Sequence, residues 1–380
     1  LSREWHVGYG DLLKYATPGF FAFGLFAYPA GWLADKWSRE GMMGVFFIGI
    51  GFSSIATSFA QSPLQIGFGL FAIGVFAAIY HPVGLTMVTQ KWKNIGMRIA
   101  VNGVWGNLGV ASAALVTGYL IDNGGWRFAF IIPGIASVAI GIAYISARWS
   151  AAKPASTTAA TGVKASQSPD YKALLLRVSA IVFLTTAVSS VIFQATTFAL
   201  PKIFDERLQG IAKALVVWTE NLSLRGQVDV ATMIGTFAFI VFTVASMAQL
   251  VVGSLLDRFG ARPVFMIVAA IQFVFFSFMP GLADGLALMV ALGFMLGAFG
   301  QIPINDYMIG KMASGEFRAR VYGVRYVVSF TALAATLPLI AFVYEQWGFD
   351  TLFRILAAAA LLILMAVACL PRKLPAQAAV

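Results

Sequence analysis

The sequence predicts an all-α membrane protein of two pseudo-symmetric six-helix bundles, with eleven of the twelve transmembrane helices present in this chain. Three observations predict this fold class: the composition, a succession of long apolar segments and an internal repeat. Hydrophobic residues make up 59% of the 380 residues and charged residues 11%, whereas soluble domains carry about 25% charged residues. A soluble chain could not bury that much apolar surface, so lipid must cover part of it.

Long apolar segments follow one another along the whole chain. A helix needs about 20 mostly apolar residues to cross the hydrocarbon core. Any one such segment could be a buried helix of a soluble protein, but eleven in succession indicate a polytopic membrane protein. The predicted spans are 11–30, 41–60, 64–88, 98–121, 126–147, 173–200, 229–252, 263–280, 285–308, 321–343 and 351–370.

Lysine and arginine gather on one side of the predicted membrane. With alternating helices, 18 of the 26 basic residues fall on the side that holds the segments near residues 36, 95, 160, 258, 315 and 372. The positive-inside rule makes that side cytoplasmic. We therefore expect a multi-pass protein of the inner (plasma) membrane with its carboxyl terminus in the cytoplasm. Topology then explains the net charge of +10, and no nucleic-acid partner is needed.

Three short segments of the first half recur in the second half at nearly one offset, which indicates duplicated halves. They are GWLADKWSRE at 31–40 with GSLLDRFGAR at 253–262 (offset 222), Pro82 with Pro303 (221), and RIAVNGV at 98–104 with RARVYGV at 318–324 (220).

The duplication also accounts for the odd number of segments. The second half has six and the first half has five, and the counterpart of 173–200 would fall before residue 1. We therefore expect the intact protein to have a further, first transmembrane helix. The predicted domains are an N-terminal bundle (1–148), a small, polar cytoplasmic linker (149–172) and a C-terminal bundle (173–380).

A Gly-x-Leu-x-Asp-basic motif lies between the second and third helices of each half, and it is similar to the signature of the major facilitator superfamily. The resemblance implies secondary transport by alternating access, with the motif holding the cytoplasmic side closed in the outward-open state. A carboxylate there can face the positive end of a neighbouring helix; the alternative is a plain charged loop. The motif residues are Gly31, Asp35, Lys36 and Arg39 in the first half and Gly253, Asp257, Arg258 and Arg262 in the second.

The chain departs from the family pattern in the first half. Ser38 and Glu40 replace an expected glycine and basic residue. Leu70 stands four positions before Gly74, where the family often has an arginine, so the arginine-linked route of proton coupling is in doubt. Within the superfamily, YHPVGLTMV at 80–88 resembles the His-Pro segment of fosmidomycin-resistance-type bacterial transporters.

Polar residues inside the predicted spans are the candidates for substrate binding or translocation, because an ionisable group in mid-bilayer costs about 2.5–3.5 kcal/mol on insertion scales. His81 can carry a proton or pack as a neutral residue, and Pro82 beside it predicts a kink. Arg325 can bind a substrate carboxylate, pair with Asp306 or reach lipid headgroups. The candidates are His81, Asn107, Thr186, Ser190, Gln194, Gln301, Asn305, Asp306, Tyr322 and Arg325.

Four of these candidates have a packing alternative. Thr186, Ser190 and Gln194 are spaced by four and share one helix face, which can line a cavity or bond to neighbouring helices. Asn107 lies among Gly103, Gly106 and Gly109, which favour close helix packing at least as much as binding.

The function that the sequence favours is secondary active transport of a small organic solute. An organic anion is favoured because of His81 and Arg325, and Asp306 is the candidate partner of a coupled cation or proton. The alternatives are an exporter of drugs or toxic metabolites and a non-transporting membrane sensor or scaffold. We expect a monomer without cofactor, metal or enzymatic activity, since the sequence has one cysteine, two distant histidines and no GxxxxGK[ST] phosphate loop.

Overall fold

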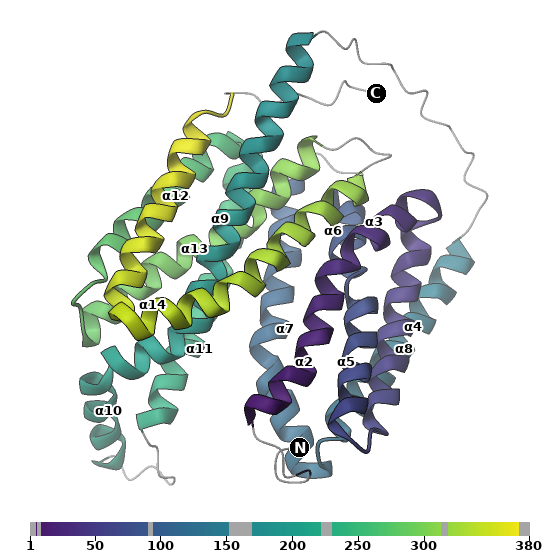
Figure 1. The fold of residues 1–380 in the computed structure, drawn as a ribbon, viewed down its shortest axis with the longest axis horizontal. Coiled ribbons are helices and arrows are strands. Elements are labelled where there is room, and N and C mark those ends of the chain that lie inside the picture. Colours follow the sequence, from purple (N-terminus) through teal and green to yellow (C-terminus); the bar gives the residue numbers. More distant parts are fainter. Residues whose placement is uncertain are drawn as a thin grey trace.

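Two groups of helices, one from each half of the chain, make up the computed structural model (Figure 1). It describes residues 5, 9–89, 94–151, 169–221, 230–312 and 318–371. The N-terminal bundle contains α2 (Tyr9–Leu25), α3 (Ala27–Lys36), α4 (Arg39–Ser58), α5 (Pro63–Ala77), α6 (Tyr80–Thr89), α7 (Ile95–Gly124) and α8 (Phe128–Ala151). The C-terminal bundle contains α9 (Pro169–Arg207), α10 (Gln209–Asn221), α11 (Val230–Phe259), α12 (Ala261–Phe278), α13 (Asp284–Met312) and α14 (Arg318–Ala368).

Each of the eleven predicted spans corresponds to one helix, to two consecutive helices or to part of a longer helix. Eight helical segments of the described residues are long and apolar enough to cross a membrane. The last two predicted spans are both parts of α14, which is interrupted at Gly348, where φ is +72°. The predicted all-α membrane fold is therefore confirmed.

Two spans of the N-terminal bundle are broken four or five residues before a proline. Proline has no N–H to donate to the carbonyl of residue i−4. The helix α2 ends at Leu25, four residues before Pro29, and α5 ends at Ala77, five before Pro82. The kink expected beside His81 is thus present as a break between α5 and α6.

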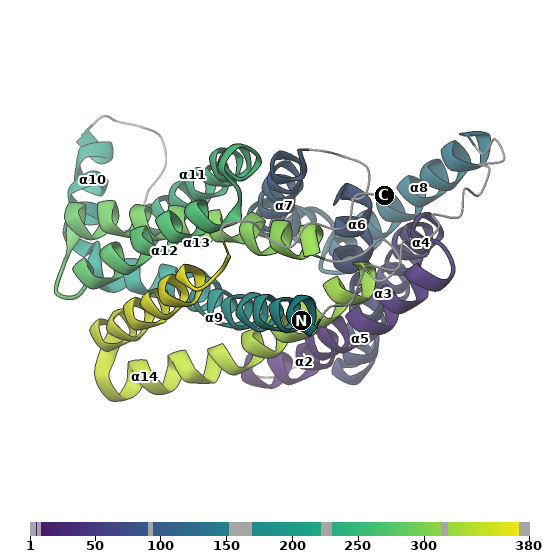
Figure 2. The ribbon, with the colours of Figure 1, turned by 90° about the horizontal axis from the view of Figure 1, so that it is seen from above.

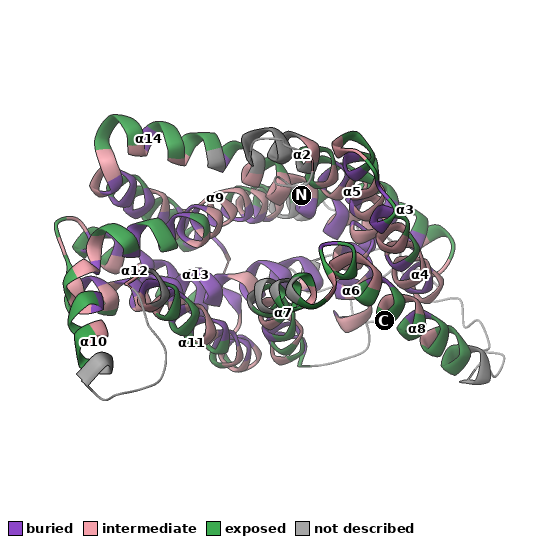
Figure 3. Ribbon diagram, turned by 90° about the horizontal axis from the view of Figure 1, so that it is seen from below, coloured by how far each residue is buried: buried purple, intermediate pink, exposed green. Residues whose placement is uncertain are grey.

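Exposed residues lie along the outer faces of both bundles (Figure 3), and many of them are large and apolar. Phe59, Phe68, Trp105 and Val110 are each more than two-thirds exposed. Exposed apolar side chains in this number fit a surface that faces lipid. The buried core of the C-terminal bundle includes the ring contacts of Phe276, Phe294 and Phe353.

The two bundles touch near one end of their helices. We call it the motif end, because it carries the segments 31–39 and 253–262. There the contacts pair α3 with α14 and α7 with α11 (Figure 2). Farther from this end, a Cβ added at Gly106 or Gly109 of α7, or at Gly235 of α11, would meet nothing within 4 Å. Among the described residues, close backbone approaches between the bundles lie at the motif end, at Gly31 and Gly253.

Candidate functional site

The aspartate of the second motif caps a helix of the other bundle. The side chain of Asp257, at the end of α11, accepts hydrogen bonds from the backbone N–H groups of Gly96 and Met97, both at 2.9 Å. These are among the first residues of α7, whose N–H groups have no partner within the helix. A carboxylate at this position also interacts favourably with the helix dipole.

The aspartate of the first motif, in the N-terminal bundle, caps a helix of the C-terminal bundle. The Asp35 carboxylate accepts a hydrogen bond from the backbone N–H of Arg320, at 3.0 Å, in the first turn of α14. It also pairs with the guanidinium groups of Arg39, at 2.8 Å, and Arg320, at 3.5 Å. The two aspartates thus cross over, each capping a helix of the opposite bundle.

The motif glycines allow the backbones to approach closely at these caps. A Cβ at Gly31 would overlap the carbonyl oxygen of Ala319 on α14. A Cβ at Gly253 would lie 2.5 Å from the Cβ of Ala100 and 2.7 Å from the carbonyl oxygen of Gly96. Only glycine fits at either position without moving a backbone.

The remaining motif residues lie outside the caps. Lys36 lies over the Trp32 ring, 4.3 Å from its centroid. Arg258 is exposed, and Arg262 donates to the carbonyl oxygen of Ala368 at the end of α14. The predicted loop is also partly helical, because α3 continues to Lys36.

A buried ion pair lies deeper than the caps. Arg325 Nη1 and Asp306 Oδ1 are 3.0 Å apart, and the two residues are 6% and 3% exposed. The helix α14 supplies the arginine and α13 the aspartate. The hydroxyl of Tyr322 donates to the backbone carbonyl of Asp306 at 2.8 Å. Since α14 begins at Arg318, Arg325 lies roughly 10 Å inside its motif end.

Four aromatic rings beside this ion pair join the two bundles. His81 of α6 stacks on Tyr326 of α14, with centroids 4.4 Å apart and planes at 28°. Phe23 of α2 contacts Phe330 of α14 at 4.2 Å and His81 at 5.6 Å. We call Phe23, His81, Tyr326 and Phe330 the aromatic cluster. The Arg325 guanidinium also lies over the Tyr326 ring, at 4.6 Å, so the ion pair and the cluster are continuous.

Neutral polar groups of α9 and α13 lie one turn farther from the motif end. Gln301 Nε2 donates to the carbonyl oxygen of Ser189 at 3.3 Å, and Asn305 Nδ2 donates to that of Gln301 at 3.3 Å. The Oε1 of Gln301, the Oδ1 of Asn305 and the hydroxyls of Thr186 and Ser189 are buried without a protein partner. Buried polar atoms are normally satisfied, so these atoms are available to a polar ligand or to water.

Some predicted residues lie outside this group. Asn107 is on α7 of the other bundle, and its buried Nδ2 has no protein partner. The hydroxyl of Ser190 donates to Ser329 of α14 at 3.1 Å, so it bonds to a neighbouring helix. Gln194 is half-buried one turn farther along α9.

The sequence interpretation did not place Tyr326, Phe23 or Phe330 in the site. Tyr326 could have been found as the neighbour of Arg325 in an apolar segment. The two phenylalanines had no signal, because aromatic residues make up 14% of the chain and nothing in the sequence distinguishes these two.

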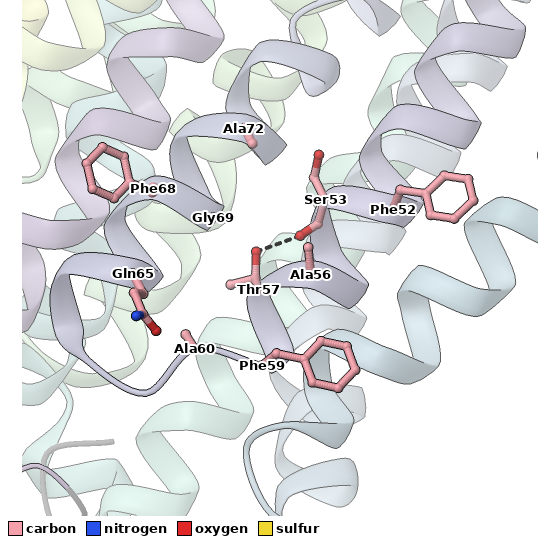
Figure 4. A pocket seen from close by; sticks show the side chains of 10 residues that line it. All are labelled: Phe52, Ser53, Ala56, Thr57, Phe59, Ala60, Gln65, Phe68, Gly69 and Ala72. Carbon is pink, nitrogen blue, oxygen red and sulfur yellow. Dashed lines mark hydrogen bonds between the residues drawn. The ribbon is translucent and has the colours of Figure 1, made fainter.

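An open hollow of about 560 Å³ lies elsewhere, on the surface of the N-terminal bundle between α4 and α5 (Figure 4). Its lining includes Phe52, Phe59, Phe68, Ser53 and Thr57. The hydroxyl of Thr57 donates its hydrogen bond to the backbone carbonyl of Ser53. None of the predicted site residues lines it. It lies on the surface that carries exposed phenylalanines and is separate from the ion pair.

The fold and these contacts define a multi-pass membrane protein with two helical bundles that meet through paired helix caps. The chain belongs to the Major Facilitator Superfamily, whose model matches residues 15–219 and 208–380. This family consists of transporters, not enzymes. The similarity to the fosmidomycin-resistance-type branch stays a prediction.

Similar proteins include two bacterial relatives and a solved transporter. The putative metabolite transport protein YaaU of Escherichia coli is 30% identical over 101 residues, which are 26% of this chain and 23% of YaaU. The niacin transporter NiaP of Acinetobacter baylyi is 26% identical over 141 residues, 36% of this chain and 32% of NiaP. The matched region thus spans a third or less of either relative. The crystal structure of FucP in the outward conformation has a TM-score of 0.73 at 14% identity, covering 97% of this chain and 91% of FucP.

Proposed function

We propose that this protein is a secondary active transporter that moves a small organic anion by alternating access. The observation that carries the proposal is the buried Arg325. Its ion-pair partner among the described residues is Asp306, and its Nε has no hydrogen-bond partner there. A guanidinium binds a carboxylate through two parallel hydrogen bonds, and a buried arginine in a membrane protein is a functional residue by default.

An aromatic monocarboxylate fits the surroundings of Arg325 best. The aromatic cluster offers ring faces beside the guanidinium, and the free polar atoms of Gln301 and Asn305 are on the neighbouring helix. One relative is named a niacin transporter, and niacin is a carboxylate on an aromatic ring. Nicotinate is therefore the first probe.

The conformation of the chain supports alternating access. We assign the motif end to the cytoplasm, because the basic residues gather there. The caps at Asp35 and Asp257 then close the cytoplasmic side, and the bundles can separate at the other end. Opening toward the cytoplasm requires both caps and the aromatic cluster to separate. In this assignment the protein lies in the plasma membrane with a cytoplasmic carboxyl terminus, and the domains are 1–148 and 173–380. Most of the linker 149–172 lies outside the described residues.

The test is uptake of radiolabelled nicotinate into proteoliposomes, with nicotinamide as the neutral analogue of the same shape. The wild-type protein should take up nicotinate and benzoate but not nicotinamide. Arg325→Gln should weaken carboxylate binding roughly ten- to hundredfold, because a hydrogen bond to a charged group contributes about 1.5–3 kcal/mol. The matched control is Arg177→Gln, an exposed arginine near the start of α9.

Equal uptake by Arg325→Gln and Arg177→Gln would remove Arg325 from the site. If the protein took up nicotinamide or a neutral sugar in preference to every carboxylate, its substrate would be a neutral solute and not an organic anion. No uptake of any solute would favour a non-transporting role.

We also propose that a further apolar transmembrane helix packs on α7. Arg98 and Arg318 are related by the repeat at an offset of 220, and the same offset relates Gly109 to Ser329 (329 − 109 = 220). Ser329 is covered by α9, whose Ser190 bonds to it. At Gly106 and Gly109, by contrast, there is open space, and Val110 is 75% exposed. A helix equivalent to α9 would fill this position in the N-terminal bundle.

A spin label at Val110→Cys in the full-length protein tests this helix. In bilayers the label should be inaccessible both to oxygen and to a water-soluble relaxation agent. A label at the exposed Val251→Cys of α11 serves as the control and should be accessible to oxygen. High oxygen accessibility at both positions would mean that lipid covers α7.

A further inference from the structure

The charges around Asp306 cancel one another. The ionisable groups that face it are Arg325, Tyr322 and Tyr326 of α14, and His81 of α6 lies across the Tyr326 ring. On its own helix, α13, the nearby polar groups are the neutral amides of Gln301 and Asn305, and α9 contributes the serine and threonine hydroxyls near Gln301. With His81 neutral, one negative and one positive charge remain.

A bound substrate carboxylate changes the net charge of this site. If it joins Arg325 while Asp306 stays ionised, two negative charges share one cation in a site that excludes water. A lone buried charge is far more costly than a neutral pair, because the attraction that offsets desolvation is missing. Two carboxylates in one site respond by binding a proton on one of them. Asp306 is the better acceptor of that proton, because the substrate must keep its charge to hold Arg325.

We propose that Asp306 is the proton-binding residue of the transport cycle, and that a substrate carboxylate takes its place on Arg325. This inference rests on the proposed anion transport. An O–H bond forms on the Asp306 carboxylate with a proton from water on the side where the substrate enters. The same bond breaks when the substrate leaves and Asp306 pairs again with Arg325. No electrons are transferred, and each monovalent anion moves with one proton, so the step is electroneutral.

His81 is the competing acceptor, and its position argues against it. Its ring lies among the rings of Phe23, Tyr80, Tyr326 and Phe330. Arg325 lies over the same Tyr326 ring. An imidazolium there would place a second cation next to Arg325 before any substrate had arrived. The carboxylate of Asp306, in contrast, loses its cation at the moment when the substrate binds.

Proton uptake during binding tests the proposal directly. Purified full-length protein in weakly buffered detergent solution, with a pH indicator, is mixed with nicotinate, and bound nicotinate is counted in parallel. We expect about one proton taken up per nicotinate bound. The affinity of the wild type should weaken about tenfold for each unit of pH increase above neutral, as one-proton linkage requires.

Three variants separate the candidates. Asp306→Asn should bind nicotinate with no proton uptake and no dependence on pH, because Arg325 is then free and nothing titrates. His81→Phe keeps the ring stack and should still take up a proton for each nicotinate that it binds. Asp205→Asn, at the exposed end of α9, should behave as the wild type. Asp306→Asn leaves a buried arginine unpaired and can fail to fold. In that case the change of nicotinate affinity with pH, measured for the wild type and for His81→Phe, decides between Asp306 and His81.

Each outcome has a distinct meaning. Binding of nicotinate by the wild type without proton uptake overturns the proton site and leaves anion transport standing. Proton uptake that persists in Asp306→Asn, or that vanishes in His81→Phe, also overturns it. Failure to bind nicotinate, benzoate or any other monocarboxylate overturns the proposed function itself and this inference with it.

Discussion

Tyr326 links the ion pair of one bundle to the helices of the other. One of its ring contacts is with Arg325, and its stacking partner is His81. Any displacement of Arg325, for example by a substrate, therefore reaches α6 through a single side chain. At the scale of residues, this tyrosine is the shortest connection between the proposed binding site and the contact between the bundles.

Removing the His81 ring should open the motif end. Aromatic pairs contribute about 0.5–1.5 kcal/mol beyond burial, so His81→Ala should raise the ratio of inward-open to closed protein roughly two- to tenfold. His81→Phe keeps a ring and should change the ratio less. Distances between spin labels on the cytoplasmic ends of the two bundles report this ratio, with the single native cysteine, Cys369, replaced. Equal populations in both variants would show that the stack does not hold the bundles together.

The sequence identified the ionisable members of this site and Tyr322, but not Phe23, Tyr326 or Phe330. His81, Asp306 and Arg325 were found because ionisable residues are rare in apolar segments. Phe23 and Phe330 gave no such signal, because in a membrane protein aromatic residues face lipid as readily as they face one another. The only signal for Tyr326 was its position next to Arg325. Which rings meet across the bundles depends on the packing of α2, α6 and α14, and no local pattern encodes that packing.

At the scale of elements, Pro82 predicted one helix break, but the sequence predicted neither the break before Pro29 nor the helical part of the first motif. The break beside Pro82 was expected from the missing N–H. The first motif, in contrast, was expected to be a loop, yet α3 continues to Lys36. Gly31 lies inside α3, where it allows a close contact with Ala319. The sequence alone does not show whether a glycine ends a helix or lies inside one at a close contact.

Gly31→Ala should push α3 away from α14. The added Cβ would meet the backbone carbonyl of Ala319, which cannot turn aside. Overpacking of this kind costs about 1–3 kcal/mol. The substitution should therefore destabilise the closed state by that amount relative to states in which α3 and α14 are apart. Gly235→Ala, on α11 with nothing within 4 Å, is the control and should not weaken closure.

Accessibility of a cysteine at Arg320 to a water-soluble maleimide, added from the cytoplasmic side, would measure the effect of Gly31→Ala. Faster labelling with Gly31→Ala than with Gly235→Ala is the expected result. Identical rates would mean that α3 and α14 tolerate the extra carbon, and that the close approach does not limit closure.

At the scale of the whole molecule, the internal repeat predicted that two equivalent motifs exist, and the structure shows that their contacts are equivalent too. Asp35 caps α14 and Asp257 caps α7. The segments that open these two helices, 98–104 and 318–324, are themselves related by the repeat at an offset of 220. The sequence could not say which helix each aspartate would cap, because each partner comes from the opposite half.

The crossed caps also bear on the order in which the chain assembles during its synthesis. Asp35 is made early, but the helix start that it caps, at Arg320, is made only after α13 has been completed. Gly96 is likewise synthesised before Asp257, which accepts the hydrogen bond from its N–H group. The N-terminal bundle must therefore insert while both Asp35 and the start of α7 still lack their partners. The closed state can form only when the ribosome has nearly finished the chain, so docking of the bundles is a late event in biogenesis.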